Sequence, residues 1–177
     1  MRNIFGFLLL FVFGSQSLYA QFFKDNFYYE GEIGGITSFF VTNPQGETKF
    51  FTYGGVSFRG GLGIHNQEES LFLGIYSGME ANIRHDTGIL PIYLNSKIAF
   101  DISDNGKIIL SYGYGKSFQV GTENYKGYLR KYTIAYARNN ENEAMESFFI
   151  EANNHGFNFP DGFPAITINI GFTYTFL

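Results

Sequence analysis

The chain of 177 residues contains no cysteine and no tryptophan, only four prolines, and only 16% charged residues. Without cysteine, it cannot form disulfides, a thiolate metal site, a cysteine nucleophile or a cysteine-linked lipid anchor. The formal net charge of -4 gives no electrostatic basis for binding nucleic acid. What is abundant instead is 22 Phe, 13 Tyr and 22 Gly, a composition that favours strands and tight turns over helices.

The amino-terminal residues have the layout of an export signal. Arg2 precedes a run of about ten apolar residues, and small and polar residues follow before Ala20. The run is too short to span a bilayer as a helix, which takes about twenty apolar residues. We therefore expect residues 1–20 to be a signal peptide cleaved between Ala20 and Gln21, and residues 21–177 to form a single domain.

The rest of the chain has no apolar run long enough for a membrane helix, and its dominant pattern is alternation. In the last segment, the even positions from Ile166 to Phe176 carry Ile, Phe or Tyr, whereas the odd positions carry Thr, Asn or Gly. This period of two is typical of a strand with one apolar face. It recurs in eight segments, which we predict to be strands at residues 27–41, 49–65, 70–84, 89–102, 107–119, 126–138, 145–153 and 164–177.

The connections between these segments alternate in kind, as in an up-and-down meander. Asn105-Gly106 is a strong hairpin signal on one side, and the longest connection, residues 154–163, belongs to the other side. The sequence therefore predicts an all-β fold, a closed antiparallel up-and-down eight-stranded transmembrane β-barrel.

The content of the polar face indicates which side of the barrel is the inside. Its charges are nearly balanced, which suits a narrow closed interior, and the apolar face carries too many large side chains to fit inside eight strands. We therefore expect the apolar face to meet lipid and the lumen to have no wide pore. The residues predicted to form a structural lumen charge network are Glu30, Glu32, Arg59, Glu80, Arg84, Lys97, Asp101, Lys131 and Glu151.

Two cations and a set of aromatic residues test this assignment. Lys116 and Arg130 fall on the apolar face, and we expect them at the level of the lipid headgroups. Tyr28 and neighbouring aromatics, and Tyr112, Tyr114, Tyr125, Tyr128 and Tyr132, are expected to form interfacial girdles. The alternative is a soluble periplasmic lipocalin-like barrel with the apolar face turned inward around a hydrophobic ligand.

The signal layout, the eight alternating segments and the last strand give the chain a recognisable profile. With residues 90–94, which read LPIYL, it resembles the small outer-membrane β-barrel superfamily of Gram-negative bacteria, the OmpA-type eight-stranded class. The resemblance implies location in the outer membrane, contact with outer-membrane lipid, and assembly by the barrel-assembly machinery. Leu177 after the last aromatic departs from the usual ending. The resemblance implies an assembly signal at Ile170, Phe172, Tyr174 and Phe176.

Residues for catalysis are few, and we assign no catalytic residue, metal or cofactor. The superfamily includes lipid A-modifying enzymes that use a rim histidine, and His85 with Asp86 or His155 with Asp161 are the candidates for that role here. No His-x-Ser spacing supports it, so we interpret these histidines as solvated loop residues. A structural or surface-interaction role is favoured, with the segment 153–163 as the best candidate for external binding.

Overall fold

The computed structural model describes residues 26–42, 48–82, 87–120, 126–140, 144–157 and 166–177. Within these ranges, no helix has the length and hydropathy needed to cross a membrane. The described chain consists of eight strands and their short connections. The strands are β1 (Phe27–Thr42), β2 (Thr48–His65), β3 (Leu71–Asn82), β4 (Thr87–Ser103), β5 (Gly106–Val120), β6 (Lys126–Asn140), β7 (Ala144–Asn154) and β8 (Ile166–Phe176).

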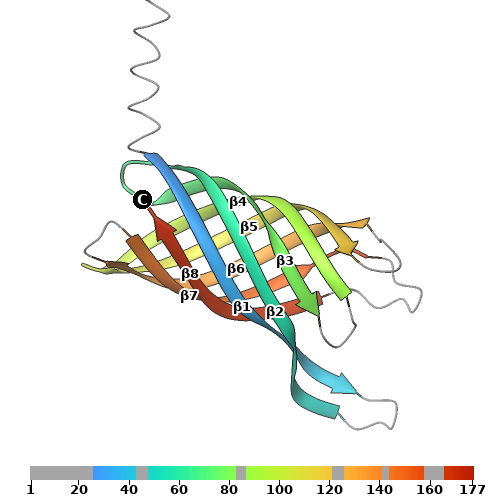
Figure 1. Cartoon of the computed structure of the whole chain (residues 1–177). Helices are drawn as coiled ribbons and strands as arrows, with labels where there is room; N and C mark the ends of the chain where they lie inside the picture. The colour runs from blue at the N-terminus through green and yellow to red at the C-terminus, as the bar shows by residue number, and fades with distance from the viewer. Residues whose placement is uncertain (1–25, 43–47, 83–86, 121–125, 141–143, 158–165) are drawn as a thin grey trace, which may run out of the picture.

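The strands close into a barrel in which each is antiparallel to the next. Closure occurs between the first and last strands, where Ile33 of β1 is paired with Phe172 of β8. Figure 1 shows the strands tilted around the barrel, with the carboxyl terminus beside the start of β1. The predicted fold class is therefore confirmed, and every strand boundary lies within two residues of its predicted position.

The barrel has two different ends. The short β2–β3 and β4–β5 connections lie at the same end as the start of β1 and the end of β8. We call this the terminus end, and we call the opposite end the loop end. The distinction fixes the depth of each residue, because position along a strand then measures distance from one rim.

The apolar face of every strand points outward. Large apolar side chains half exposed on the outer surface include Ile33 at 51%, Leu94 at 56% and Phe172 at 63%. A soluble lipocalin-like barrel would turn this face inward, so that alternative is wrong. The physical reason is volume, because an eight-stranded barrel has space inside only for one set of packed side chains.

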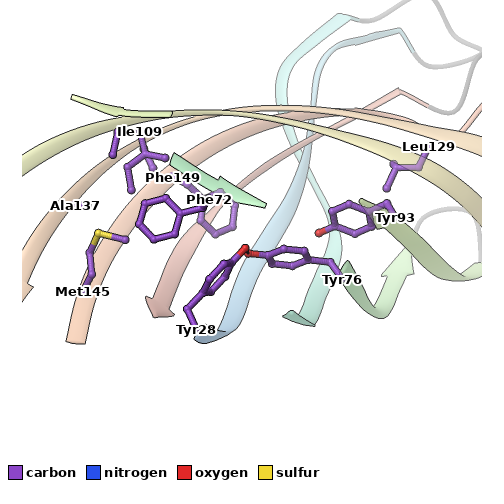
Figure 2. Packing of buried hydrophobic residues seen from close by; sticks show 11 residues of the cluster. Tyr28, Phe72, Tyr76, Tyr93, Ile109, Leu129, Ala137, Met145 and Phe149 are labelled. Atoms are coloured by element: carbon purple, nitrogen blue, oxygen red, sulfur yellow. The ribbon is translucent and has the colours of Figure 1, made fainter. Parts of the chain in front are cut away.

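The lumen contains more large side chains than the sequence pattern suggested. Figure 2 shows an apolar cluster around Phe72 and Phe149, with the hydroxyl ends of Tyr28 and Tyr76 meeting beside it. Tyr28 is fully buried, so its expected place in an outer girdle is wrong. It lies two residues before Glu30 on the same strand, so both side chains are on the same face and point into the lumen.

Glycines make room for these rings. A Cβ at Gly61 would lie 2.3 Å from the ring of Tyr76, and a Cβ at Gly113 would lie 2.9 Å from the ring of Tyr93. In both pairs a ring occupies the space that a side chain on a neighbouring strand would need. The many glycines of the polar face thus allow bulky side chains to cross a narrow interior.

At the loop end, β1 and β2 extend beyond the other strands as a two-stranded hairpin (Figure 1). The described pairing of β1 with β8 stops at Thr37, and that of β2 with β3 stops at Gly55. The β1–β2 register shifts between Ile36 and Thr37, and Gly55 has a φ of 155°. A bulge increases the local bend and twist of a strand, so this irregularity lies where the hairpin leaves the barrel wall.

Candidate functional site

The centre of the lumen contains a group of five charged side chains, Glu32, Arg59, Glu80, Lys131 and Glu151, which we call the central charge cluster. They come from β1, β2, β3, β6 and β7. Alternate residues of each strand point into the lumen, and these five are among the inward-pointing residues. All five are buried, with exposed fractions between 0% and 8%. Buried charges are stable only when paired and hydrogen-bonded, so their contacts decide what the lumen does.

Arg59 contacts all three carboxylates of the cluster. Its Nη2 lies 2.6 Å from Oε1 of Glu151 and its Nη1 lies 2.9 Å from Oε2, a bidentate pair. Nη2 also donates to Oε1 of Glu80 at 3.0 Å, and Nη1 donates to Oε2 of Glu32 at 3.3 Å. The planar guanidinium suits this role, because its donors point in fixed directions and can serve several carboxylates at once.

The local sequence makes room for the stem of Arg59. Gly78 of β3 is paired directly with Arg59. A Cβ at Gly78 would lie 2.6 Å from the Arg59 Cα and 2.9 Å from its Cγ. A side chain at position 78 would therefore clash with the backbone and stem of Arg59, and the glycine avoids this clash.

Lys131 completes the cluster from the opposite wall. Its Nζ lies 2.8 Å from Oε1 of Glu32 and 2.8 Å from Oε2 of Glu151. It also donates to the Tyr93 hydroxyl at 3.2 Å. Glu151 further accepts amide hydrogen bonds from Asn153 at 2.6 Å and Asn169 at 2.9 Å. Such a network of charge-assisted hydrogen bonds fixes the side chains and the strands that bear them.

A second ion pair lies nearer the terminus end. Lys97 of β4 pairs with Glu30 of β1, and the Tyr76 hydroxyl donates to Glu30 at 3.0 Å. The Tyr76 ring stacks on Tyr93 at a centroid distance of 5.4 Å, and Tyr93 contacts the central charge cluster. Ion pairs and tyrosine rings therefore form one continuous packed column inside the barrel.

Towards the loop end, the column continues as a chain of three side chains. The Ser117 Oγ lies 2.9 Å from Nδ1 of His155, and Nε2 of His155 lies 3.0 Å from Oε2 of Glu80. The His155 ring also stacks on Phe157 with an interplanar angle of 13°. Ser117, His155 and Glu80 are all 0% exposed. The interpretation of His155 as a solvated loop residue is therefore wrong, because it lies inside the barrel.

Seven of the nine residues expected in the lumen charge network lie in these two groups. Asp101 is an exception, since its side chain is 73% exposed and lies 3.8 Å from Lys107. Its parity is inward, but it lies at the terminus rim, where the β4–β5 register shifts and inward parity no longer means burial. Arg84, His85, Asp86 and Asp161 lie outside the described residues, as do Ala20 and Gln21, so the expected cleavage stays a prediction.

A depression of about 750 Å³ opens at the terminus end. Its lining includes Asn26, His65, Phe72 and Lys97. Phe72 belongs to the apolar cluster and Lys97 is paired with Glu30, so the depression lies against the packed column. In the described ranges, no group of three or more His, Cys, Asp or Glu side chains could hold a metal ion.

Sequence reasoning missed Ser117, His155 and the inward tyrosines as parts of the lumen, although a signal for them existed. His155 continues the odd parity of Glu151 and Asn153, so extending β7 by one step places it inside. Tyr76 lies between Gly74 and Gly78 on the inward face. No local pattern reveals that Ser117 and Glu80, on different strands, meet at one histidine.

No family model matches the sequence, and no curated protein sequence matches it. Solved structures do match the fold. Neisserial surface protein A, NspA, superposes with a TM-score of 0.61 at 12% identity, covering 85% of this chain and 96% of that one. The amino-terminal β-barrel domain of Pseudomonas aeruginosa OprF superposes with a TM-score of 0.51 at 9% identity, covering 86% of this chain and 98% of that domain. With its closed barrel and outward apolar face, the chain therefore has the fold of the eight-stranded outer-membrane β-barrels of Gram-negative bacteria.

Proposed function

We propose that this protein is an integral outer-membrane barrel with a structural or surface-interaction role, that it is not an enzyme, and that its loop end faces outward from the cell. The observation that carries the proposal is the packed lumen. Arg59, Lys131 and three glutamates meet at its centre, tyrosines and an apolar cluster fill the terminus side, and His155 fills the loop side. A lumen filled in this way leaves no wide aqueous path.

The protruding β1–β2 hairpin supports a role in surface interaction. The part of β1 after Thr37 and the part of β2 before Gly55 form the hairpin, and the described residues of these two parts pair only with each other. Each therefore presents an outer strand edge, and such an edge offers backbone donors and acceptors to a partner. In segment 153–163, Phe157 is buried against His155, so an external contact of that segment would involve other residues.

Electrical recordings test whether the barrel is closed. The purified protein is inserted into planar lipid bilayers, and its folded state is checked beforehand by gel mobility with and without boiling. We expect no steady single-channel steps from the folded protein, because the buried ion pairs occupy the lumen. Regular conductance steps from folded protein, absent with boiled protein, would contradict the proposal and indicate a pore.

One observation favours a second candidate function, that of a lipid A-modifying hydrolase. The contacts from Ser117 to His155 to Glu80 follow the order of a nucleophile, a base and an orienting acid. Full burial opposes it, because a nucleophile must reach its substrate and the Ser117 side chain points into the lumen.

An activity assay separates the two candidates. Lipid A is incubated with the folded protein, and released acyl chains are measured for the wild type, Ser117→Ala and a matched control, Ser111→Ala on the same strand. We expect no release from any of them. Release that is lost in Ser117→Ala and kept in Ser111→Ala would support the enzyme and overturn the structural role.

For biogenesis, we propose that β8 provides the assembly signal read by the barrel-assembly machinery. Phe172 and Phe176 are exposed on the outer face, and Ile170 and Tyr174 share their parity. Phe176→Ser is expected to lower the amount of folded barrel in cells, whereas Thr175→Ser, beside it on the inward face, is expected to have little effect. Equal amounts of both variants in the membrane would contradict this role.

A further inference from the structure

We propose that Lys116 and Arg130 form a binding site, on the outer face of β5 and β6, for the phosphate of an anionic lipid in the leaflet at the loop end. The proposal requires only that the barrel lies in a membrane. It does not depend on whether the lumen conducts or the hairpin binds.

Both side chains lie on the lipid-facing surface, and the strand register makes them neighbours. Lys116 is paired with Tyr128, and Arg130 is paired with Tyr114. The two cations are therefore diagonal to each other across adjacent strands, within reach of a single small anion. Lys126, two residues before Tyr128 on the same face, is exposed on the loop-end side of Lys116.

The two cations lack the acidic partners that the inward-facing lysines of the barrel have. Among the described residues, no carboxylate forms an ion pair with Lys116 or Arg130, whereas Lys97 has one carboxylate partner and Lys107 and Lys131 have two each. On the same outward face of β6, the strand register places Arg138 directly opposite an acidic residue, Glu146, whereas the residues opposite Lys116 and Arg130 in the β5–β6 pairing are tyrosines. Two adjacent positive charges at a surface of low dielectric repel each other unless an anion lies between them.

The Arg130 guanidinium lies over the ring of the residue that is opposite Lys116. Its Cζ lies 4.9 Å from the centre of the Tyr128 ring, and Tyr128 is the residue directly opposite Lys116. A cation over a tyrosine ring keeps its hydrogen-bond donors free at the edge of the guanidinium. A phosphate oxygen placed between Arg130 and Lys116 would accept hydrogen bonds from both.

The depth of the site matches a layer of headgroups. On β5, Lys116 lies eight residues beyond Ile108, which corresponds to about 20 Å of height at about 3.3 Å per residue and a tilt of about 40°. The apolar band of such barrels is about 25 Å tall, so Lys116 lies near its loop-end edge. Tyr112 and Tyr132 lie on the membrane side of the cations, where aromatic rings favour the interface.

Lipid retention tests the proposal. The folded protein in a neutral detergent is mixed with phosphatidic acid or phosphatidylcholine, and the bound lipid is counted by native mass spectrometry. We expect the wild type to retain phosphatidic acid and not phosphatidylcholine, and the double variant Lys116→Gln/Arg130→Gln to bind phosphatidic acid about 30-fold more weakly, since each surface cation contributes about fivefold.

Arg138→Gln is the matched control, because it removes a cation from the same face of the same strand at the other end of the barrel. It is expected to bind like the wild type. Equal retention by the wild type and the double variant would overturn the proposal, as would an equal loss in Arg138→Gln. Inorganic phosphate is added as a competitor, and its binding with the same affinity as the lipid would show a free-anion site instead.

Gel mobility before and after boiling verifies that each variant is folded. If the double variant fails to fold, the single variant Arg130→Gln and a salt titration of the wild type replace it. Retention by the wild type must then fall as the ionic strength rises, because the proposed contact is between an exposed anion and exposed cations. Retention that does not change with salt would contradict the site.

Discussion

At the scale of single residues, the barrel depends on pairs of side chains that meet across the lumen. Arg59 and Glu151 are separated by 92 positions in the sequence and form a bidentate pair at the barrel centre. Replacing one member of such a pair leaves a buried charge without its partner. That is far more costly than the modest net gain that the pair itself provides.

Glu151→Gln is expected to destabilise the folded barrel by about 3 to 5 kcal/mol, because Arg59 and Lys131 would both lose a carboxylate in a buried site. Urea unfolding in detergent, followed by circular dichroism, measures the change. Glu146→Gln on the same strand is the control, since Glu146 is exposed. If both variants lowered the free energy of unfolding by a similar amount, the stabilising role of the central charge cluster would be contradicted.

Gly61→Ala tests the packing of the tyrosine rings. A Cβ at this position would lie 2.3 Å from the Tyr76 ring, whose hydroxyl is held by Glu30. We expect a loss of about 1 to 3 kcal/mol from overpacking, measured by the same unfolding transition. Gly31→Ala, where a new Cβ would have no neighbour within 4 Å, is the comparison. If it costs as much as Gly61→Ala, loss of glycine itself and not the ring contact explains the effect.

At the scale of the strands, alternation and depth together set the cost of a substitution. In β8, Ile166 and Phe172 both face outward, but Ile166 begins the strand at the loop end and Phe172 lies near its middle. The outer face therefore differs along a single strand, from headgroup level to the hydrocarbon of the bilayer.

Phe172→Lys is expected to cost about 2 to 4 kcal/mol and to lower the folded fraction, whereas Ile166→Lys is expected to cost about 0 to 1 kcal/mol. Folding into lipid vesicles followed by urea titration measures both. A penalty as large for Ile166→Lys as for Phe172→Lys would show that the assumed depth of β8 is wrong.

The β1–β2 hairpin is expected to be dispensable for the barrel itself. Among the described residues of the range 39–51, strand pairing is only between β1 and β2, so replacing this range by a short glycine-containing turn leaves the described pairing of β1 with β8 and of β2 with β3 intact. We expect the heat-dependent gel mobility to persist and the unfolding midpoint to change little. Loss of the folded band would show that the hairpin is needed for closure and weaken its assignment to surface contacts.

At the scale of the whole molecule, the barrel has an apolar outer face and a polar, densely packed lumen. Its outer face supplies apolar side chains to lipid, and every strand finds two neighbours, so no edge of the closed wall is exposed to the bilayer. The lumen is filled by rings and ion pairs, with no disulfide to hold it. We expect the protein in the outer-membrane fraction to run at a different position on a gel before and after boiling. A protein recovered in the soluble periplasm without this shift would contradict the membrane assignment.

The sequence by itself determined the number of strands, their bounds and the face that meets lipid. The period of two is a local property, read from side chains two residues apart, and it does not depend on how the barrel closes. Asn105-Gly106 likewise marked its turn through local backbone preference. Most of the charged lumen residues followed from parity alone.

Only the tertiary structure decided which side chains meet. The contact of His155 with Ser117 and Glu80, and the pairing of Arg59 with three glutamates, depend on the stagger of strands around the closed barrel. The exposure of Asp101 depends on where the rim lies relative to β4. Alternation specifies a face, but closure and stagger specify the height and the partner across the lumen, and these are set by all eight strands together.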